Sequence, residues 1–138
     1  MAVSMGRQMA RNFCHYPELA DVQLVTAVPL FPSKARARGY NQSERLGRSF
    51  SHHTGLPWAP SLLKRTRNTV SQTRLNRAGR LANMSGAFTC TNWQQVKGKV
   101  ILLIDDVATT GATLEGCAVA LKAAGAKRVL AYTYAREN

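Results

Sequence analysis

The clearest hydrophobic pattern lies in the last forty residues of the chain. Val100–Ile104 is continuously apolar, which is typical of a parallel strand that is covered on both faces. Residues 105–111 are predicted to be a loop, and apolar positions at helical spacing over 113–124 predict a helix that ends at Gly125. A closing strand is expected over 128–134. This order is a βαβ unit, whose crossover should be right-handed.

Shorter elements are predicted in the first two thirds of the chain. Asn41, with Glu44 three residues later, has the spacing of a helix N-cap, and Gly55 is expected to end that helix. The other elements are expected as helices over 5–13 and 75–82, strands over 24–28, 62–63 and 86–90, and a loop over 65–73. The pattern as a whole predicts a single α/β domain over 1–138, with a small, mostly parallel sheet flanked by helices.

Charge changes this picture, because it is concentrated in one segment. The 138 residues include 19 Lys and Arg against 7 Asp and Glu, a net charge of +12. Between Lys34 and Arg80 lie eleven basic residues and one acid, Glu44, so this segment alone carries +10. Such a field favours anionic partners, namely nucleic acid, polyphosphates or phosphorylated metabolites. The alternative is a solvated basic face that serves solubility.

Several protein classes are excluded or disfavoured by composition. No apolar run approaches the roughly 20 residues that a membrane span needs, and residues 1–10 hold no apolar stretch of signal-peptide length, so we expect a cytoplasmic protein. Cys14, Cys90 and Cys117 are odd in number and far apart, which argues against a disulfide framework or a zinc ribbon. No zinc is expected in this chain.

The strongest functional signal follows the apolar strand directly. Asp105 and Asp106 fall at its carboxyl end, where open α/β sheets bind ligands. Because neighbouring side chains on a regular strand point to opposite faces, two acids in a row predict that the strand ends there. Carboxylates in this place can accept hydrogen bonds from sugar hydroxyls or hold a hydrated Mg2+.

Small residues come next, in the order Ala108, Thr109, Thr110, Gly111, Ala112 and Thr113. A small-residue turn that opens a helix offers backbone N–H groups, hydroxyls and the positive end of the helix dipole to a phosphate. Acids for a sugar beside amides for a phosphate predict a site for ribose 5-phosphate. The alternative is a polar strand end with helix-capping threonines.

These residues resemble a known motif. The stretch from Val100 to Thr113 is similar to the phosphoribosyl pyrophosphate (PRPP) motif of type I phosphoribosyltransferases. Val28-Pro29-Leu30, Arg38–Glu44 and residues 72–88 resemble the competence protein F (ComF/GntX) family, and the likeness runs from about Gly6 to Glu137. Family members usually begin with a cysteine-rich module that this sequence lacks, so the chain resembles the phosphoribosyltransferase domain alone.

The resemblance implies a role for each matching residue. Asp105 and Asp106 would hold the ribose 2- and 3-hydroxyls, directly or through Mg2+, and residues 108–113 would surround the 5-phosphate. The loop after the first strand, with Ser33 and Lys34, would contact pyrophosphate, and Arg65 and Arg67 would neutralise the leaving group from a closing loop. The candidates for nucleic-acid contact are Arg36, Arg38, Tyr40, Arg74, Arg77 and Arg80.

Three functions remain open on the sequence. The first is a pentosyltransferase, a glycosyltransferase that moves ribose 5-phosphate from PRPP to an unidentified acceptor. The second is a competence or DNA-utilisation protein that binds single-stranded DNA through the 34–80 segment. The third is a regulatory relative that binds PRPP or a nucleotide without chemistry. Whether the chain forms a homodimer is also left open.

Overall fold

A computed structural model describes residues 2–13, 15–29, 41–65, 87–108 and 111–136 of the chain. Its helices are α1 (Ala2–Phe13), the 3-10 turn η1 (Pro17–Leu19), α3 (Gln42–Thr54), α5 (Trp93–Val96) and α6 (Ala112–Ala123). Its strands are β1 (Leu24–Ala27), β2 (Leu63–Arg65), β3 (Phe88–Cys90), β4 (Val100–Ala108) and β5 (Arg128–Arg136).

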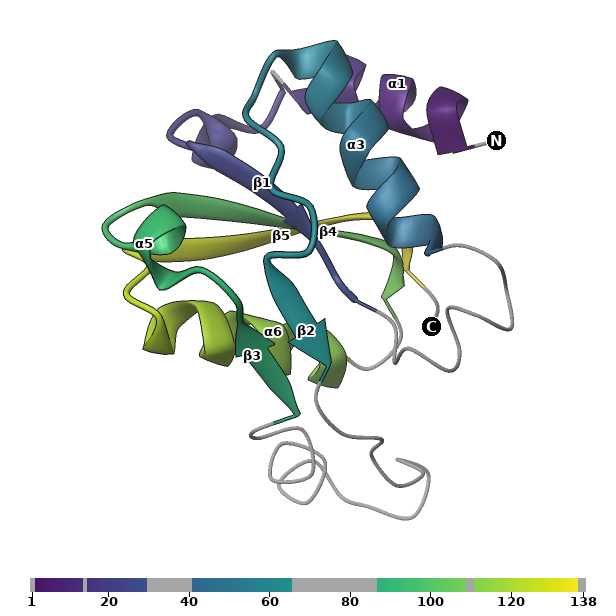
Figure 1. The fold of residues 1–138 in the computed structure, drawn as a ribbon. Helices are drawn as coiled ribbons and strands as arrows, with labels where there is room; N and C mark the ends of the chain where they lie inside the picture. The colour runs from purple at the N-terminus through teal and green to yellow at the C-terminus, as the bar shows by residue number, and fades with distance from the viewer. Residues whose placement is uncertain (1, 14, 30–40, 66–86, 109–110, 137–138) are drawn as a thin grey trace.

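A three-stranded parallel sheet of order β1-β4-β5 forms the centre of the molecule. Figure 1 shows α1 and α3 on one face of this sheet, and α6 with the antiparallel pair β2–β3 on the other. Leu102 and Ile104 of β4 pack toward the α1–α3 face, and Ile101 and Leu103 pack toward the α6 face. The strand is therefore covered on both sides, which explains its unbroken apolar sequence, and the expected α/β class is confirmed.

The helix boundaries follow local signals that the sequence contains. Asn41 caps α3, because its side-chain oxygen accepts from the backbone N–H groups of Ser43 at 3.0 Å and Glu44 at 3.3 Å. At the other end Gly55 adopts a left-handed conformation with φ of 78°, which an L side chain disfavours. The helix expected over 75–82 lies outside the described residues.

One expectation about β4 is wrong. The strand does not end before Asp105 and Asp106 but continues to Ala108, and the expected loop over 105–111 is correspondingly shorter. The reason is that β4 has a second neighbour: β1 pairs with it only as far as Ile104, whereas β5 pairs with it up to Ala108 opposite Arg136. The two acids thus lie on a strand that is paired on one side only.

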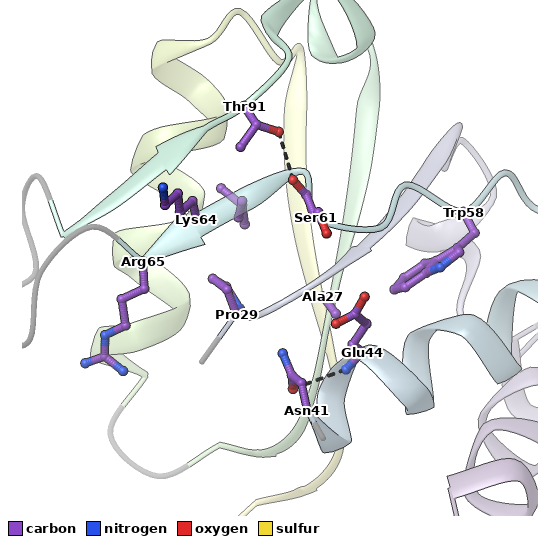
Figure 2. Close-up of a pocket in the computed structure, with 10 residues that line it drawn as sticks. Ala27, Pro29, Asn41, Glu44, Trp58, Ser61, Lys64, Arg65 and Thr91 are labelled. Carbon is purple, nitrogen blue, oxygen red and sulfur yellow. Dashed lines mark hydrogen bonds between the residues drawn. The ribbon is translucent and has the colours of Figure 1, made fainter. Parts of the chain in front are cut away.

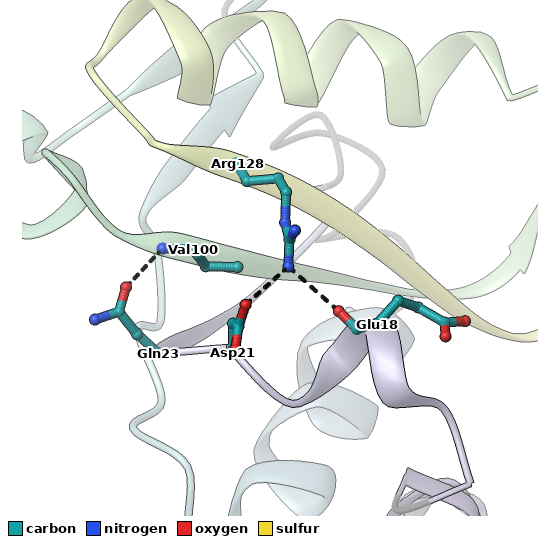
Figure 3. Close-up of polar contacts among 5 residues, drawn as sticks. All are labelled: Glu18, Asp21, Gln23, Val100 and Arg128. Atoms are coloured by element: carbon teal, nitrogen blue, oxygen red, sulfur yellow. Dashed lines mark hydrogen bonds and ion pairs between the residues drawn. The ribbon is translucent and has the colours of Figure 1, made fainter.

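Surface polar groups join the elements at the amino ends of these strands (Figure 3). The side chain of Gln23 accepts a hydrogen bond from the backbone N–H of Val100 at 2.9 Å. Arg128 lies 3.6 Å from a carboxylate oxygen of Asp21, and both side chains are largely exposed. The same guanidinium donates to the carbonyl of Glu18 at 3.4 Å. This end of the sheet is linked through solvent-facing contacts.

Within the part of the chain that the structure describes, no helix is both long and apolar enough to cross a membrane. Cys117 is fully buried in α6, and Cys90 is partly exposed.

Candidate functional site

The site begins where β1 and β4 separate. The backbone N–H of Val28 donates to the carbonyl of Ile104 at 3.0 Å. In a parallel ladder that continued, the N–H of Asp106 would next donate to the carbonyl of Val28. Instead, the Val28 carbonyl accepts from Asn41 Nδ2 at 3.1 Å, and the Asp106 N–H donates to Ser43 Oγ at 3.2 Å. The first turn of α3 therefore replaces the next ladder bond.

Both acids contact the same hydroxyl group. Ser43 Oγ lies 2.7 Å from Asp105 Oδ1 and 3.2 Å from Asp106 Oδ1. A hydroxyl has one proton, so Ser43 donates it to the nearer carboxylate, that of Asp105. The Asp106 N–H also donates to Asp105 Oδ1, at 2.9 Å. Two consecutive strand residues, which would ordinarily face opposite sides of the sheet, are thus held together.

Burial makes this pair of acids electrostatically costly. Asp105 and Asp106 are both partly buried. The pKa of Asp105 is raised to about 6, mainly by burial and also by the neighbouring Asp106, while the hydrogen bond from Ser43 acts in the opposite direction. A cation or the hydroxyl groups of a sugar would relieve this cost, because each stabilises the ionised carboxylates.

The Cys117 thiol interacts electrostatically with both Asp105 and Arg65. Burial raises the pKa of the Cys117 thiol, and the charge of Asp105 raises it further. Burial also lowers the pKa of Arg65, whose guanidinium carbon lies 5.5 Å from the centre of the Phe88 ring. Cys117 is therefore a neutral packing group rather than a nucleophile.

The small residues after β4 lead into the helix that the sequence predicts. Ala108 is the last residue of β4, and α6 begins at Ala112, one residue earlier than expected. Gly111 stands at the N-cap of α6 with φ of 83°, a left-handed conformation that favours glycine. The amino end of this twelve-residue helix, with Thr113 in its first turn, follows the acids closely in the chain.

The remaining predicted contacts divide between described and undescribed segments. Arg65 is the last residue of β2. The other predicted phosphate, pyrophosphate and nucleic-acid contacts lie outside the described residues; they are Ser33, Lys34, Arg36, Arg38, Tyr40, Arg67, Arg74, Arg77, Arg80, Thr109 and Thr110. Their roles stay predictions.

A pocket of about 320 Å³ lies beside the first turn of α3 (Figure 2). Asn41, the N-cap of α3, and Glu44 in its first turn line the pocket on one side. Lys64 and Arg65 line it from β2, and Trp58 lies on the side away from β2. Ser43, between Asn41 and Glu44 in sequence, contacts the acids instead. The first turn of α3 therefore contributes both to the acid pair and to this pocket.

Trp58 is held in place by its own segment. The backbone of residues 57–59 pairs with the outer edge of β1, with Val25 donating to the Pro57 carbonyl and accepting from the Ala59 N–H, both at 2.9 Å. The indole packs so closely on α3 that a Cβ at Gly47 would lie 2.6 Å from its ring. Its N–H is buried and has no hydrogen-bond partner among the described residues.

The donor set at the acid pair suits Mg2+ bound together with a phosphorylated ligand. Two adjacent carboxylates are typical of Mg2+ sites that are completed by water and substrate phosphates. Among the residues that the structure describes, no three His, Cys, Asp or Glu side chains gather into a metal cluster. The acids therefore fit a Mg2+ site that water and a phosphorylated ligand complete better than a site made of protein groups alone.

Sequence reasoning missed the part played by Ser43. It treated residues 41–44 as a helix cap, which is correct, but gave the serine no role at the acid pair. The available signal was its position: it opens the helix that follows the first parallel strand, and that strand ends beside the acids.

Comparison with protein families agrees with this geometry. A family model described as "Phosphoribosyl transferase domain" matches residues 2–138. Among curated proteins, "DNA utilization protein YhgH" of Salmonella typhimurium is 32% identical over 99% of this chain and 60% of its own length. "Competence protein F" of Haemophilus influenzae is 29% identical over 83% of this chain and 50% of its own length. The chain thus spans half to three fifths of these relatives, which confirm the resemblance inferred from the motifs.

Solved structures show the same fold. A glutamine PRPP amidotransferase from B. subtilis, complexed with ADP and GMP, superposes with a TM-score of 0.63 at 21% identity, over 96% of this chain and 26% of that one. A hypoxanthine phosphoribosyltransferase from Staphylococcus aureus superposes with a TM-score of 0.52 at 12% identity, over 96% and 61% of the two chains. At these identities the likeness is one of fold.

Proposed function

Because the chain belongs to the phosphoribosyl transferase domain family, we propose that it binds PRPP or a ribose-5-phosphate nucleotide with Mg2+ and transfers the phosphoribosyl group to an acceptor. The observation that carries this proposal is the pair Asp105–Asp106, held at the carboxyl end of β4 immediately before the amino end of α6. Acids suit a sugar diol and a helix amino end suits a phosphate.

Each part of the site has a separate task. Asp105 and Asp106 accept hydrogen bonds from the ribose hydroxyls or hold the Mg2+, which neutralises phosphate charge when bound. The backbone N–H groups at the start of α6 bind the 5-phosphate. Arg65, with Lys64 beside it, places positive charge at the pocket, where it meets the pyrophosphate end of the ligand.

The reaction requires no protein nucleophile. The bond between ribose C1 and pyrophosphate breaks, and pyrophosphate leaves with the electron pair. A lone pair of the acceptor forms the new bond to C1, and the acceptor then loses its proton to solvent or to a base. The protein contributes by positioning the two reactants and by neutralising charge as the leaving group departs.

Calorimetry with PRPP and Mg2+ tests the proposal. The wild-type chain should bind, and the double variant Asp105→Asn/Asp106→Asn should bind at least about 100-fold more weakly, because two charge-assisted contacts are removed. Asp21→Asn is the matched control, since it removes an exposed acid at the opposite end of the sheet and should leave binding unchanged. Absence of wild-type binding, or undiminished binding by the double variant, would contradict the proposal. Binding without turnover across a panel of acceptors would favour the regulatory alternative.

A second function has its own support. The relatives are named for competence and DNA utilisation, and the segment Lys34–Arg80 carries a net charge of +10. If this segment binds single-stranded DNA, affinity for a labelled oligonucleotide should fall steeply with salt, and the slope should report the number of phosphates neutralised. Absence of binding at low salt would exclude this function. Both functions are compatible in one protein.

A further inference from the structure

We propose that Ser43 is the positioning residue that fixes the acid pair for a ribose diol, and that the preference of the site for ribose over 2-deoxyribose depends on it. The inference rests on the proposed function. It assigns Ser43 a role through Asp105 and Asp106 rather than direct contact with the reacting atoms.

The contacts of Ser43 are unusual for a helix serine. Serine and threonine inside helices commonly bond within their own helix or its end. Elsewhere in α3, Thr54 donates to the Phe50 carbonyl at 2.9 Å and Ser51 donates to the Leu56 carbonyl at 2.9 Å. Ser43 instead reaches across to β4, 62 residues away in sequence, and is only 5% exposed. The contacts of its hydroxyl are therefore with the two acids rather than with its own helix.

The location of Ser43 is itself fixed from both sides. Its backbone N–H donates to Asn41, whose amide in turn donates to the carbonyl of Val28 at the end of β1. Its hydroxyl donates to Asp105 and accepts from the Asp106 N–H. Ser43 thus links the end of β1 to the carboxylates of β4. It accepts from the Asp106 N–H, which would otherwise have formed the next ladder bond with β1.

Fixed carboxylates are what recognition of a diol requires. Two neighbouring hydroxyls offer two donors at a set separation, and they match two acceptors only if those acceptors keep their own separation. Without the Ser43 hydroxyl, like charges on Asp105 and Asp106 repel one another and the pair spreads. A sugar with both hydroxyls then loses its advantage over a sugar with one.

Calorimetry with ribose 5-phosphate and 2-deoxyribose 5-phosphate, both with Mg2+, tests this inference. The wild-type chain should prefer ribose 5-phosphate by about tenfold or more, the effect of one well-formed hydrogen bond. In Ser43→Ala the preference should fall to roughly threefold or less, mainly through weaker binding of the ribose form. A purely structural effect would weaken both sugars equally and leave the ratio unchanged.

Two further variants make the comparison decisive. Ser51→Ala removes an equally buried hydroxyl from the same helix, away from the acids, and should keep the wild-type ratio. Ser43→Cys preserves nearly the same volume with a much weaker donor, and should lose the preference even if Ser43→Ala does not fold. Thermal unfolding of each variant confirms that folded protein is compared.

The outcomes separate the two proposals. If wild type binds ribose 5-phosphate selectively and the Ser43 variants keep that selectivity, the role of Ser43 is refuted while the proposed function stands. If wild type binds both sugars equally, the assignment of the acids to the sugar hydroxyls is refuted, and the role of Ser43 with it. If wild type binds neither sugar nor PRPP, the proposed function itself is refuted.

Discussion

At the amino ends of β1 and β4, polar side chains lie on the surface, and at the carboxyl ends of the same two strands they are drawn inward. Asp21 at the amino end is paired with Arg128 in solvent, with 73% of its side chain exposed. Asp105 at the carboxyl end is partly buried beside a second acid, and its pKa is raised to about 6. An aspartate thus has little effect on stability at one end of the sheet and lowers stability at the other.

The difference supports our proposal that the carboxyl end of the sheet has a role beyond holding the fold. A surface ion pair contributes little to stability and can be lost without consequence. Two partly buried like charges lower stability, and such a pair is a candidate for a binding role. The end with exposed polar contacts therefore differs from the end where we propose that the ligand binds, and substitutions at the two ends should differ in the size and sign of their effect on stability and in its dependence on pH.

The largest effect is expected for Asn41→Ala at the carboxyl end. The variant loses the α3 cap and leaves the Val28 carbonyl without its donor, and together these should lower the free energy of unfolding by about 2 kcal/mol. Urea denaturation measures it. Asn92→Ala is the matched control, because Asn92 caps only the four-residue α5 at an exposed position and should cost about 0.5 kcal/mol. Equal losses would show that the contact with Val28 is unimportant.

Next in size is Asp105→Asn, which should stabilise the protein above pH 7. The folded pKa of about 6 exceeds the ordinary value of 3.8, so the folded state binds more protons between these values, and stability falls as pH rises through that window. Asparagine removes this loss, a gain of about 1 to 2 kcal/mol at pH 8 that vanishes near pH 4. Thermal unfolding across pH measures it. A gain of the same size at pH 4 would contradict the electrostatic explanation.

Gln23→Ala at the amino end should have a smaller effect. Its side chain accepts from the Val100 N–H, but the residue is exposed and water can replace it. A loss of about 0.5 kcal/mol is expected, with no dependence on pH. Denaturation at pH 5 and pH 8 checks both points, and a loss above about 2 kcal/mol would show that this end is more tightly organised than its exposure indicates.

The smallest effect is expected for Asp21→Asn, which breaks the ion pair with Arg128. Because both side chains are exposed, the change in unfolding free energy should stay below about 0.5 kcal/mol and should disappear in 0.5 M salt. Denaturation at low and high salt tests this. A large effect that persists in salt would remove the contrast between the two ends.

Much of the fold could be predicted because the signals were local. The apolar run Val100–Ile104, the cap at Asn41 and the glycine at position 55 each act within a few residues, and each is found where the pattern placed it. The likeness to phosphoribosyltransferases was recoverable for the same reason, since the acids and the small residues after them are contiguous in the chain.

What could not be predicted depends on contacts between distant segments. The alternation of side chains predicted a strand that ends before Asp105. Nothing in the local sequence shows that β5 pairs with β4 beyond the point where β1 stops pairing with it. The role of Ser43 depends on a contact spanning 62 residues. The pocket beside Trp58 likewise requires that residues 57–59 pair with β1, which no periodicity in the sequence indicates.

Because β4 is paired only with β5 beside the acids, substitutions in β5 should affect ligand binding. Thr133 stands opposite Asp105 and Ala135 stands opposite Val107, so this stretch of β5 is the remaining main-chain support of the acids. In a saturation mutagenesis survey, proline at Tyr134, the residue between them whose N–H the register directs toward β4, should reduce ligand binding as severely as changes to the acids, whereas substitutions other than proline at exposed Ala131 should be tolerated. Substitutions in β5, which contains no acid, would then reduce ligand binding as substitutions in the binding site itself do.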